Sequence, residues 1–310
     1  MTYHHLSKKT HFMLKQISLF ALVGLLLCSA GCNKKAQTSG ETGYRDEDLI
    51  ITSDQYDLPA TLCIPDGEGP FPAVVMLHGT GSNRNEAGNG YVYASHELAS
   101  KYQIASVHID FPGSDLSDAD STLYEYDSAA KAAADAADYL AGLENIRSDS
   151  VGVMGWSQGG TIALLAAGRY PDRFKSVVTW SGAPDLMKVG LFSEEDLEEA
   201  LEKGYFLMNF DFRDSVKTSL NWCEDVMGTD VLDEFEDGYK GPVLAIAGTA
   251  DTTVDPTQSE DIVDASDNGK SRLILVEGMD HTLNVFSEED KHTLYKVIDE
   301  TGNFFTDTLN

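Results

Sequence analysis

Basic side chains are scarce in this sequence of 310 residues, where 22 Lys and Arg stand against 51 Asp and Glu for a formal net charge of −29. Three of those lysines lie within residues 1–31, so the remainder of the chain is more acidic still. A surface with this charge repels nucleic acids and anionic polymers, which excludes DNA and RNA binding. The apolar share of 42% is ordinary for a globular protein and excludes general disorder.

Long hydrophobic runs are also lacking. The apolar run that follows the three lysines, "ISLFALVGLLL" at residues 17–27, is too short to span a bilayer as a helix but suits the core of a signal peptide. The next residues, "CSAGC", resemble the bacterial lipobox, in which a cysteine is lipidated and becomes the new N-terminus. Cys32 fits this role better than Cys28, because the bulky Leu27 precedes Cys28.

This pattern predicts a chain in three parts. Residues 1–31 form a lipoprotein signal peptide, residues 32–45 a flexible polar tether, and residues 46–310 the folded domain. The protein is then exported and held on the bacterial cell membrane by its lipid, facing outside the cytoplasm. Ordinary secretion and an uncleaved anchor are the alternatives, and the pattern does not fix an oligomeric state.

Cysteine is used sparingly, with four in the whole chain. Besides the two in the "CSAGC" stretch there are only Cys63, in an expected strand, and Cys223, in an expected helical segment. In an exported protein these two could form a disulfide, or they could be two buried thiols; the sequence gives no distance between them.

From residue 46 onward, short apolar runs alternate with helical patterns. Continuous apolar runs are typical of parallel strands buried on both faces, so the alternation predicts a doubly wound, mostly parallel α/β sheet of eight strands. The first two strands have no helix between them and should form an antiparallel edge. The expected strands cover residues 49–53, 60–65, 73–78, 104–110, 151–156, 176–180, 243–248 and 272–277; the expected helices cover 124–143, 159–170, 257–266 and 287–305.

Residues 183–240 break this rhythm. We expect an acidic helix at 193–204, a hairpin arm at 205–212 and an amphipathic segment at 214–228. An insertion here lies over the carboxyl ends of the strands, where open α/β sheets bind their ligands. The segment is therefore predicted to be a small cap inserted after the sixth strand.

The stretch "VGVMGWSQGGT" carries the first chemical signal. Gly155, Ser157 and Gly159 form a G-x-S-x-G motif between an expected strand and an expected helix, which is the context of a nucleophile elbow. The two glycines give room for the strained turn, and the helix N-terminus favours developing negative charge. In isolation the pentapeptide would be weak evidence, and Ser157 could lie in an ordinary turn.

A serine hydroxyl needs a base, and the base needs a carboxylate to orient it. His281 lies in "EGMDHTLNV", in the loop between the last expected strand and the last helix, from which it can reach Ser157. His292 fits a solvated or packing residue, and the remaining histidines have no supporting motif. Asp251 in "GTADTTVDP" is the expected partner, with Asp255 as its rival.

Acyl transfer also needs donors for the developing oxyanion. The segment "HGTGSNRNE" at residues 78–86 follows an expected strand, and its glycines let the backbone approach a substrate oxygen closely. The backbone N–H groups of Thr80 and Gln158 are the expected donors. The alternative is a tight glycine turn without function.

The chain resembles the α/β-hydrolase superfamily over nearly everything after residue 45, through "HGTG", "GWSQGG", "GTADTTVDP" and "GMDH" in that order. "HIDFPGSDLSD" and "DVLDEFEDGYKGPVLAIAGTAD" are similar to the cinnamoyl and feruloyl esterases and to the serine-aminopeptidase-like, dienelactone-hydrolase-related branch. The resemblance implies ester hydrolysis through an acyl-enzyme, without metal or cofactor. It implies Ser157 as nucleophile, His281 as acid and base, and Asp251 as its partner.

The leading hypothesis is a carboxylesterase that acts on small-molecule esters, small or aryl and of the cinnamoyl or feruloyl type. Aromatic residues of the cap, notably Phe206, Phe210 and Trp222, suit an apolar acyl or aryl group, although each could simply pack the cap onto the core. Two alternatives remain: a peptidase or amidase of the serine aminopeptidase type, and a surface lipoprotein that binds a ligand without turnover.

Overall fold

The structure is a computed structural model that describes residues 43–310. The expected signal peptide, the lipidation candidate Cys32 and most of the expected tether lie outside the described residues. Within residues 43–310, no helix is long and apolar enough to cross a membrane. The first strand begins at Tyr44, slightly before the expected start of the domain at residue 46, because residues 44 and 45 already pair with the second strand.

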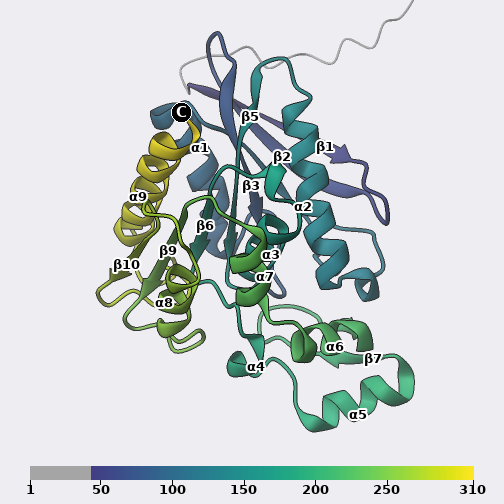
Figure 1. Cartoon of the computed structure of the whole chain (residues 1–310). Helices are drawn as coiled ribbons and strands as arrows, with labels where there is room; N and C mark the ends of the chain where they lie inside the picture. Colours follow the sequence, from purple (N-terminus) through teal and green to yellow (C-terminus); the bar gives the residue numbers. More distant parts are fainter. Residues whose placement is uncertain (1–42) are drawn as a thin grey trace, which may run out of the picture. The chain divides into compact units, whose positions relative to one another are not determined.

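An eight-stranded sheet forms the centre of the described chain (Figure 1). Its strand order is β1-β2-β4-β3-β5-β6-β9-β10. β1 pairs antiparallel with β2, as expected, and β2 also pairs antiparallel with β4, while the other neighbours are parallel. The strands are β1 (Tyr44–Ile51), β2 (Leu58–Pro65), β3 (Phe71–Leu77), β4 (Ala105–Ile109), β5 (Ile146–Trp156), β6 (Val177–Trp180), β9 (Val243–Gly248) and β10 (Arg272–Val276).

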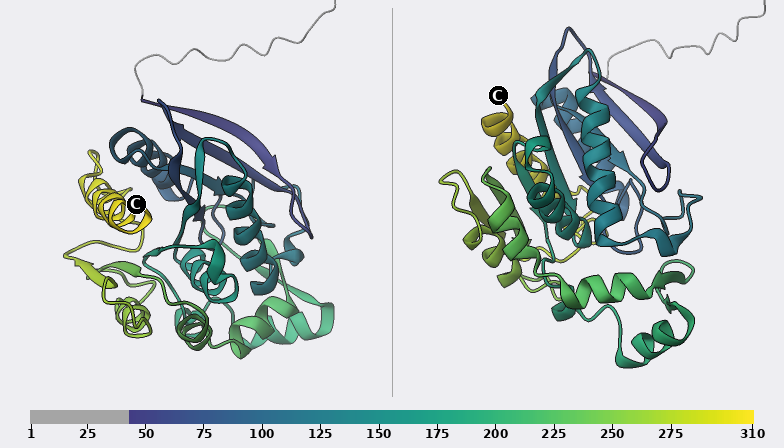
Figure 2. Two further views of the ribbon diagram at one scale, coloured as in Figure 1. Left: turned by 45° about the horizontal axis from the view of Figure 1, so that its top comes forward. Right: turned by 45° about the vertical axis from the view of Figure 1, so that its right-hand side comes forward.

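Helices cover both faces of this sheet, which confirms the doubly wound α/β fold (Figures 1 and 2). One face packs against α2 (Tyr126–Ala141), α3 (Gln158–Arg169) and α8 (Thr257–Asp264), and the other against α1 (Gly90–Tyr102) and α9 (His292–Leu309). The Ala-rich surface of α2 lets that helix lie close to the strands, since ten of its residues, mostly alanines, are buried.

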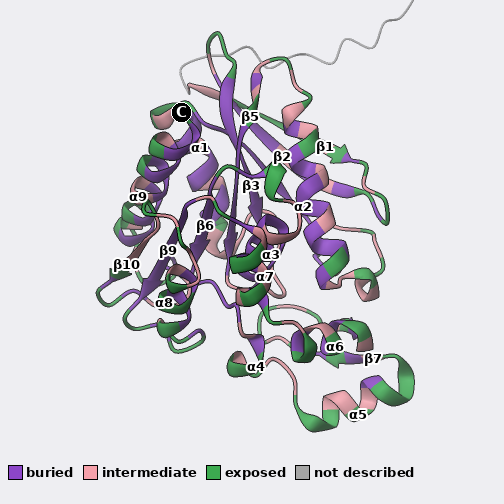
Figure 3. Ribbon diagram, in the orientation of Figure 1, coloured by how far each residue is buried: buried purple, intermediate pink, exposed green. Residues whose placement is uncertain are grey.

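The core is correspondingly divided by the sheet into two apolar clusters. Figure 3 shows the central strands and the inner sides of these helices as buried. All residues of β3, β4, β6 and β9 are buried, which explains why they appear in the sequence as continuous apolar runs rather than as alternating ones. The sheet is thereby a rigid base for the loops that leave its carboxyl edge.

The segment between β6 and β9 forms a cap of short elements. It contains α4 (Leu186–Val189), α5 (Glu194–Lys203), β7 (Tyr205–Met208), β8 (Val216–Ser219), α6 (Leu220–Gly228) and α7 (Val231–Gly238). β7 and β8 pair as a small antiparallel hairpin. The expectation of one amphipathic segment over 214–228 was wrong in part: its first residues form β8, because they complete the hairpin that β7 begins, and only the remainder is helical.

Cys63 and Cys223 are both free and buried, so they form no disulfide with each other. Burial raises the pKa of the Cys63 thiol well above its usual value and that of Cys223 to about 11. Both are therefore neutral thiols that fill space in the core, as the second of the two interpretations held.

Candidate active site

Ser157 lies at the tip of a sharp turn between β5 and α3. Its backbone has φ 55° and ψ −123°, a conformation that is strained for any residue with a side chain. Its backbone N–H donates to the carbonyl of Trp180 at 2.9 Å, and its carbonyl accepts from Gly160 at 2.8 Å, so both neighbours hold the strained residue in place. This is the geometry that the G-x-S-x-G motif predicts.

The two outer glycines of the motif are required by close backbone approach. A Cβ on Gly155 would lie 1.9 Å from the carbonyl oxygen of Gly159, and a Cβ on Gly159 would lie 2.0 Å from that of Leu77. Neither clash can be relieved by moving a side chain, because both involve backbone atoms. The turn therefore depends on glycine at both positions.

His281 and Asp251 come together across loops that follow neighbouring strands. His281 Nδ1 and Asp251 Oδ2 are 2.9 Å apart, with the Asp251 carboxylate fully buried and the imidazole one-fifth exposed. Burial alone would raise the pKa of Asp251, but the bond to His281 and the backbone N–H groups of Val254 and Thr253 hold it below its usual value. Asp251 is therefore ionised and fixes the histidine tautomer that carries the proton on Nδ1.

The rival carboxylate has a different environment. Asp255 is exposed and accepts from the backbone N–H and the hydroxyl of Thr257, at 2.9 and 2.7 Å, next to the start of α8. These bonds lower the pKa of Asp255. The structure thus pairs His281 with Asp251 and uses Asp255 to cap a helix.

The loop that carries His281 is tied to the strand that carries the serine. Trp156, the last residue of β5, donates its indole N–H to the backbone carbonyl of His281 at 3.0 Å. No hydrogen bond joins Ser157 to His281 among the described contacts, but both side chains line one pocket. Such bonds are often long in the absence of substrate. The sequence analysis assigned no role in the site to Trp156, because a tryptophan at the end of a buried strand gives no separate signal.

The segment after β3 lies beside the serine, where the expected oxyanion loop should be. A Cβ on Gly79 would lie 3.2 Å from the Cβ of Ser157, so the backbone of this loop passes directly over Ser157. The Thr80 hydroxyl donates to Gln158 Oε1 at 2.6 Å and links the two residues whose N–H groups are the expected donors. Within residues 43–310, neither of those N–H groups donates to another residue.

Glu86 holds this loop from within, and the sequence analysis did not single it out. Its carboxylate accepts from the Gly79 N–H, from the Ser82 hydroxyl at 2.7 Å and from the Ala87 N–H at 2.9 Å. Its backbone has φ 60° and ψ 176°, a region that almost only glycine adopts. Its side chain thus makes two bonds to the expected oxyanion loop and one to the residue that follows it, which is the geometry of a positioning residue.

The pocket that holds Ser157 and His281 has a volume of about 610 Å³. Its walls come from the oxyanion loop, from the His281 loop and from the cap, and its apolar lining consists mainly of Leu186, Val189, Leu191, Phe210, Phe212 and Phe286. The cap residues among these lie over the carboxyl end of β5, which is the position expected for the insertion. A pocket of this size suits a small organic molecule.

The three cap aromatics chosen from the sequence separate in the structure. Phe206 and Trp222 are both 1% exposed and pack on each other and on Phe192. Phe206 lines neither the pocket of Ser157 and His281 nor the smaller cavity that adjoins it. Phe210 is half-buried and lines the catalytic pocket. Phe206 therefore packs the cap, whereas Phe210 is placed to contact a ligand.

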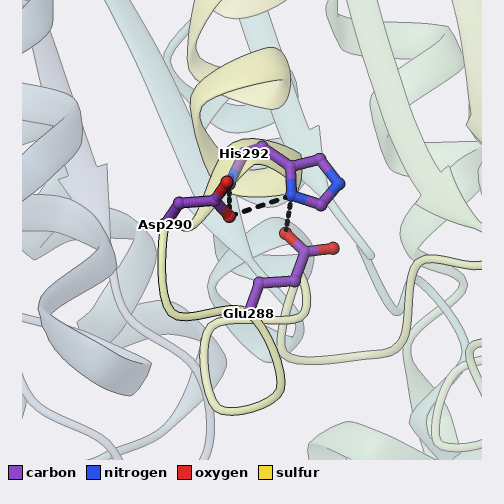
Figure 4. A group of neighbouring side chains, drawn as sticks. All are labelled: Glu288, Asp290 and His292. Atoms are coloured by element: carbon purple, nitrogen blue, oxygen red, sulfur yellow. Dashed lines mark hydrogen bonds and ion pairs between the residues drawn. The ribbon is translucent and has the colours of Figure 1, made fainter.

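The other histidines among residues 43–310 do not line the pocket of Ser157 and His281. His78 and His108 are buried and His96 pairs with Asp46. His292 lies with Glu288 and Asp290 at the start of α9 (Figure 4). One imidazole nitrogen and one oxygen of each carboxylate, which are the atoms that could hold a metal ion, lie within 4.8 Å of one another. The Glu288 carboxylate also accepts from the N–H and hydroxyl of Thr293, so these residues serve to cap the helix.

Comparison with known proteins decides the family. Residues 127–310, more than half of the chain, match the prolyl oligopeptidase family. The chain belongs to this family. As a member of the prolyl oligopeptidase family it is a hydrolase of the α/β-hydrolase superfamily, in agreement with its mostly parallel sheet.

The chain is also similar to individual known proteins. The chain is 34% identical over 143 residues to 2,6-dihydropseudooxynicotine hydrolase of Paenarthrobacter nicotinovorans, a match that covers 45% of this chain and about a third (35%) of that protein. Est1E from Butyrivibrio proteoclasticus, solved with ferulic acid bound, has a TM-score of 0.69 at 22% identity over 84% of this chain and 99% of that one. Dienelactone hydrolase from Anabaena variabilis has a TM-score of 0.61 at 21% identity over 86% and 100%. At these identities the structures share the fold.

Proposed function

We propose that this protein is a carboxylesterase that cleaves small or aryl esters through an acyl-enzyme. The observation that carries the proposal is that His281, paired with the buried Asp251 at 2.9 Å, lines one pocket with a serine on a strained elbow. A pocket lined by leucine, valine and phenylalanine supports an apolar acyl or aryl group. The ferulic acid bound to Est1E, a protein of the same fold, is in keeping with an aryl substrate.

In the proposed mechanism, Ser157 Oγ attacks the ester carbonyl while His281 Nε2 takes the hydroxyl proton. Asp251 stabilises the imidazolium that results, and the N–H groups of Thr80 and Gln158 bind the oxyanion of the tetrahedral intermediate. The carbon–oxygen bond to the alcohol then breaks, and His281 returns the proton to the leaving oxygen. Water, deprotonated by His281, hydrolyses the acyl-enzyme and restores the serine.

Ser157→Ala tests the nucleophile. Ester hydrolysis should fall by about 10⁶-fold, to background, because no other group in the pocket can form the acyl-enzyme. The assay follows p-nitrophenyl acetate and methyl ferulate, and circular dichroism checks that the variant is folded. Retained turnover in a folded variant would assign the attack to another residue.

A peptidase or amidase is the second candidate, because the chain belongs to the prolyl oligopeptidase family. Aminoacyl p-nitroanilides, assayed beside the esters, separate the two. Faster turnover of the anilides would favour the peptidase. A protein that binds without turnover is the third alternative, and covalent labelling of Ser157 by a fluorophosphonate would exclude it, since an unactivated serine does not react.

We also propose that the chain is exported and anchored through a lipid on Cys32, on the strength of the lipobox-like "CSAGC". Cys32→Ser should move the protein from the membrane fraction to the soluble fraction, and Cys28→Ser, the matched control, should not. Continued membrane attachment of Cys32→Ser would point to an uncleaved anchor instead.

A further inference from the structure

A second, smaller cavity of about 50 Å³ adjoins the catalytic pocket on the other side of the oxyanion loop. Residues 79–82 and Phe210 line both cavities. Phe210 packs directly on Gly81, where a Cβ would lie 2.4 Å from its ring, so this ring and the loop form the wall between the two spaces. A substrate carbonyl at the expected oxyanion donors would therefore lie next to this cavity.

Two residues that line this cavity carry buried donors without partners. Gln158 and Trp222 are each 1% exposed, and within residues 43–310 neither Gln158 Nε2 nor Trp222 Nε1 has a hydrogen-bond partner. The orientation of the Gln158 amide is fixed by the Thr80 hydroxyl, which donates to Oε1 and leaves the NH₂ group unpaired. Buried donors are seldom left unpaired, so the pair calls for an acceptor that arrives with a ligand.

The charge of the lining agrees with such a ligand. No Asp or Glu lines this cavity in a chain that has 51 of them. Lys217 of the hairpin strand β8 borders the cavity, but its ammonium lies over the Tyr205 ring, 4.7 Å from the ring centroid. The catalytic pocket, by contrast, is lined by two carboxylates, Glu86 and Asp115, and by Arg213. The small cavity is therefore a place where an electron-rich oxygen meets neutral donors and no carboxylate.

We propose that this cavity is a subsite for a carbonyl or carboxylate oxygen on the acyl part of the substrate. Trp222 Nε1 and Gln158 Nε2 donate to that oxygen, and the acyl chain reaches it past the Phe210 ring. Because no Asp or Glu borders the cavity, an ionised carboxylate is accepted as well as a neutral carbonyl. The inference rests on the proposed ester hydrolysis and narrows its substrate class to esters of oxo acids or dicarboxylic acids.

Three esters of nearly equal size test the subsite: methyl pentanoate, methyl levulinate, and monomethyl succinate. They carry at the same distance from the ester a methylene, a ketone and a carboxylate; methyl hexanoate, methyl 5-oxohexanoate and monomethyl glutarate repeat the comparison one carbon further. Hydrolysis is followed by proton release at constant pH. The kcat/KM ratio of the levulinate to the pentanoate should be about tenfold or more, since a site built to bond an oxygen rejects the analogue without it.

Trp222→Phe removes the indole donor and keeps an aromatic ring. It should lower the ratio of levulinate to pentanoate about three- to tenfold, the value of one hydrogen bond. The ratio of succinate to pentanoate should fall with it, since the same donor serves both kinds of oxygen. The matched control is Trp180→Phe, because Trp180 Nε1 already donates to Thr301 at 2.9 Å in the core, away from both cavities.

Thermal unfolding gives a second measurement, which does not depend on turnover. Both variants lose buried packing, but only Trp180→Phe also loses a satisfied hydrogen bond, so it should lower Tm by about 2–4 °C more than Trp222→Phe does. A cavity that merely holds water would give equal losses of Tm and an unchanged ester ratio, which overturns the subsite. Hydrolysis of all esters at equal rates also overturns the subsite but leaves the esterase proposal intact, whereas no Ser157-dependent hydrolysis of any ester overturns both.

Discussion

The rim of the sheet and the cap that covers it are built in different ways. At the rim, Ser157 and Asp251 each follow a buried strand and His281 follows the partly exposed edge strand β10. Each of the three is fixed by backbone contacts with neighbouring strands or loops. In the cap, two four-residue strands and short helices pack mainly on one another through aromatic rings. The comparison indicates that the chemistry belongs to the scaffold and that the choice of substrate belongs to the cap.

The rim should be sensitive to changes of a single atom. Asp251→Asn should reduce kcat by about 10³–10⁴-fold, because the amide donates where the carboxylate accepts and so favours the wrong histidine tautomer. Asp255→Asn, the matched control four residues away, should change kcat by less than about twofold, since that carboxylate only caps α8. Steady-state kinetics with p-nitrophenyl acetate measures both. The reverse order of effects would move the acid to Asp255.

A smaller effect is expected for a residue that positions the oxyanion loop without taking part in the reaction. Glu86→Gln should lower kcat about tenfold with little change in KM, because an amide offers one acceptor oxygen to the Gly79 N–H, the Ser82 hydroxyl and the Ala87 N–H together. Ser82→Ala removes one of those donors and should have a weaker effect of the same kind. A rise in KM at constant kcat would mean that Glu86 contacts substrate and does not position the loop.

The smallest effect concerns the interior of the scaffold and appears in stability. Burial lowers the pKa of His108, in β4, to about 4, so the unfolded chain binds this proton more readily than the folded one between about pH 6.5 and 4. The stabilisation is complete above pH 6.5 and is lost as the pH falls toward 4. Between pH 7 and 4.5, the free energy of unfolding measured in urea should fall by about 2–3 kcal/mol more in the wild type than in His108→Asn. Equal losses of unfolding free energy in the two proteins would mean that His108 is charged or hydrated within the sheet.

Much of the rim could be predicted from the sequence because its signals are local. A buried strand followed by G-x-S-x-G predicts the elbow, and the chain order of Ser157, Asp251 and His281 predicts the fold. The central strands were placed nearly correctly because strands buried on both faces are continuous apolar runs. The edge strand β1 begins at Tyr44 and not at the expected residue 49, because most of its residues are exposed and give no apolar run.

The missed features depend on contacts between distant residues. Glu86 is one carboxylate among 51 acidic residues until its bonds to the oxyanion loop are seen. The β8 strand resembled a helix because four residues are too few to display a period, and pairing with β7 decided its conformation. Phe206 and Phe210 could not be told apart for the same reason, since the direction of a cap side chain depends on what the cap packs against.

The central claim is that His281 and Asp251 together activate the hydroxyl of Ser157. The position of a covalent label tests this claim most directly. Peptide mass spectrometry after reaction with a fluorophosphonate should find the label on Ser157, with a rate that falls sharply in Asp251→Asn and stays near wild type in Asp255→Asn. A label on another residue, or a rate that is indifferent to Asp251, would contradict the account.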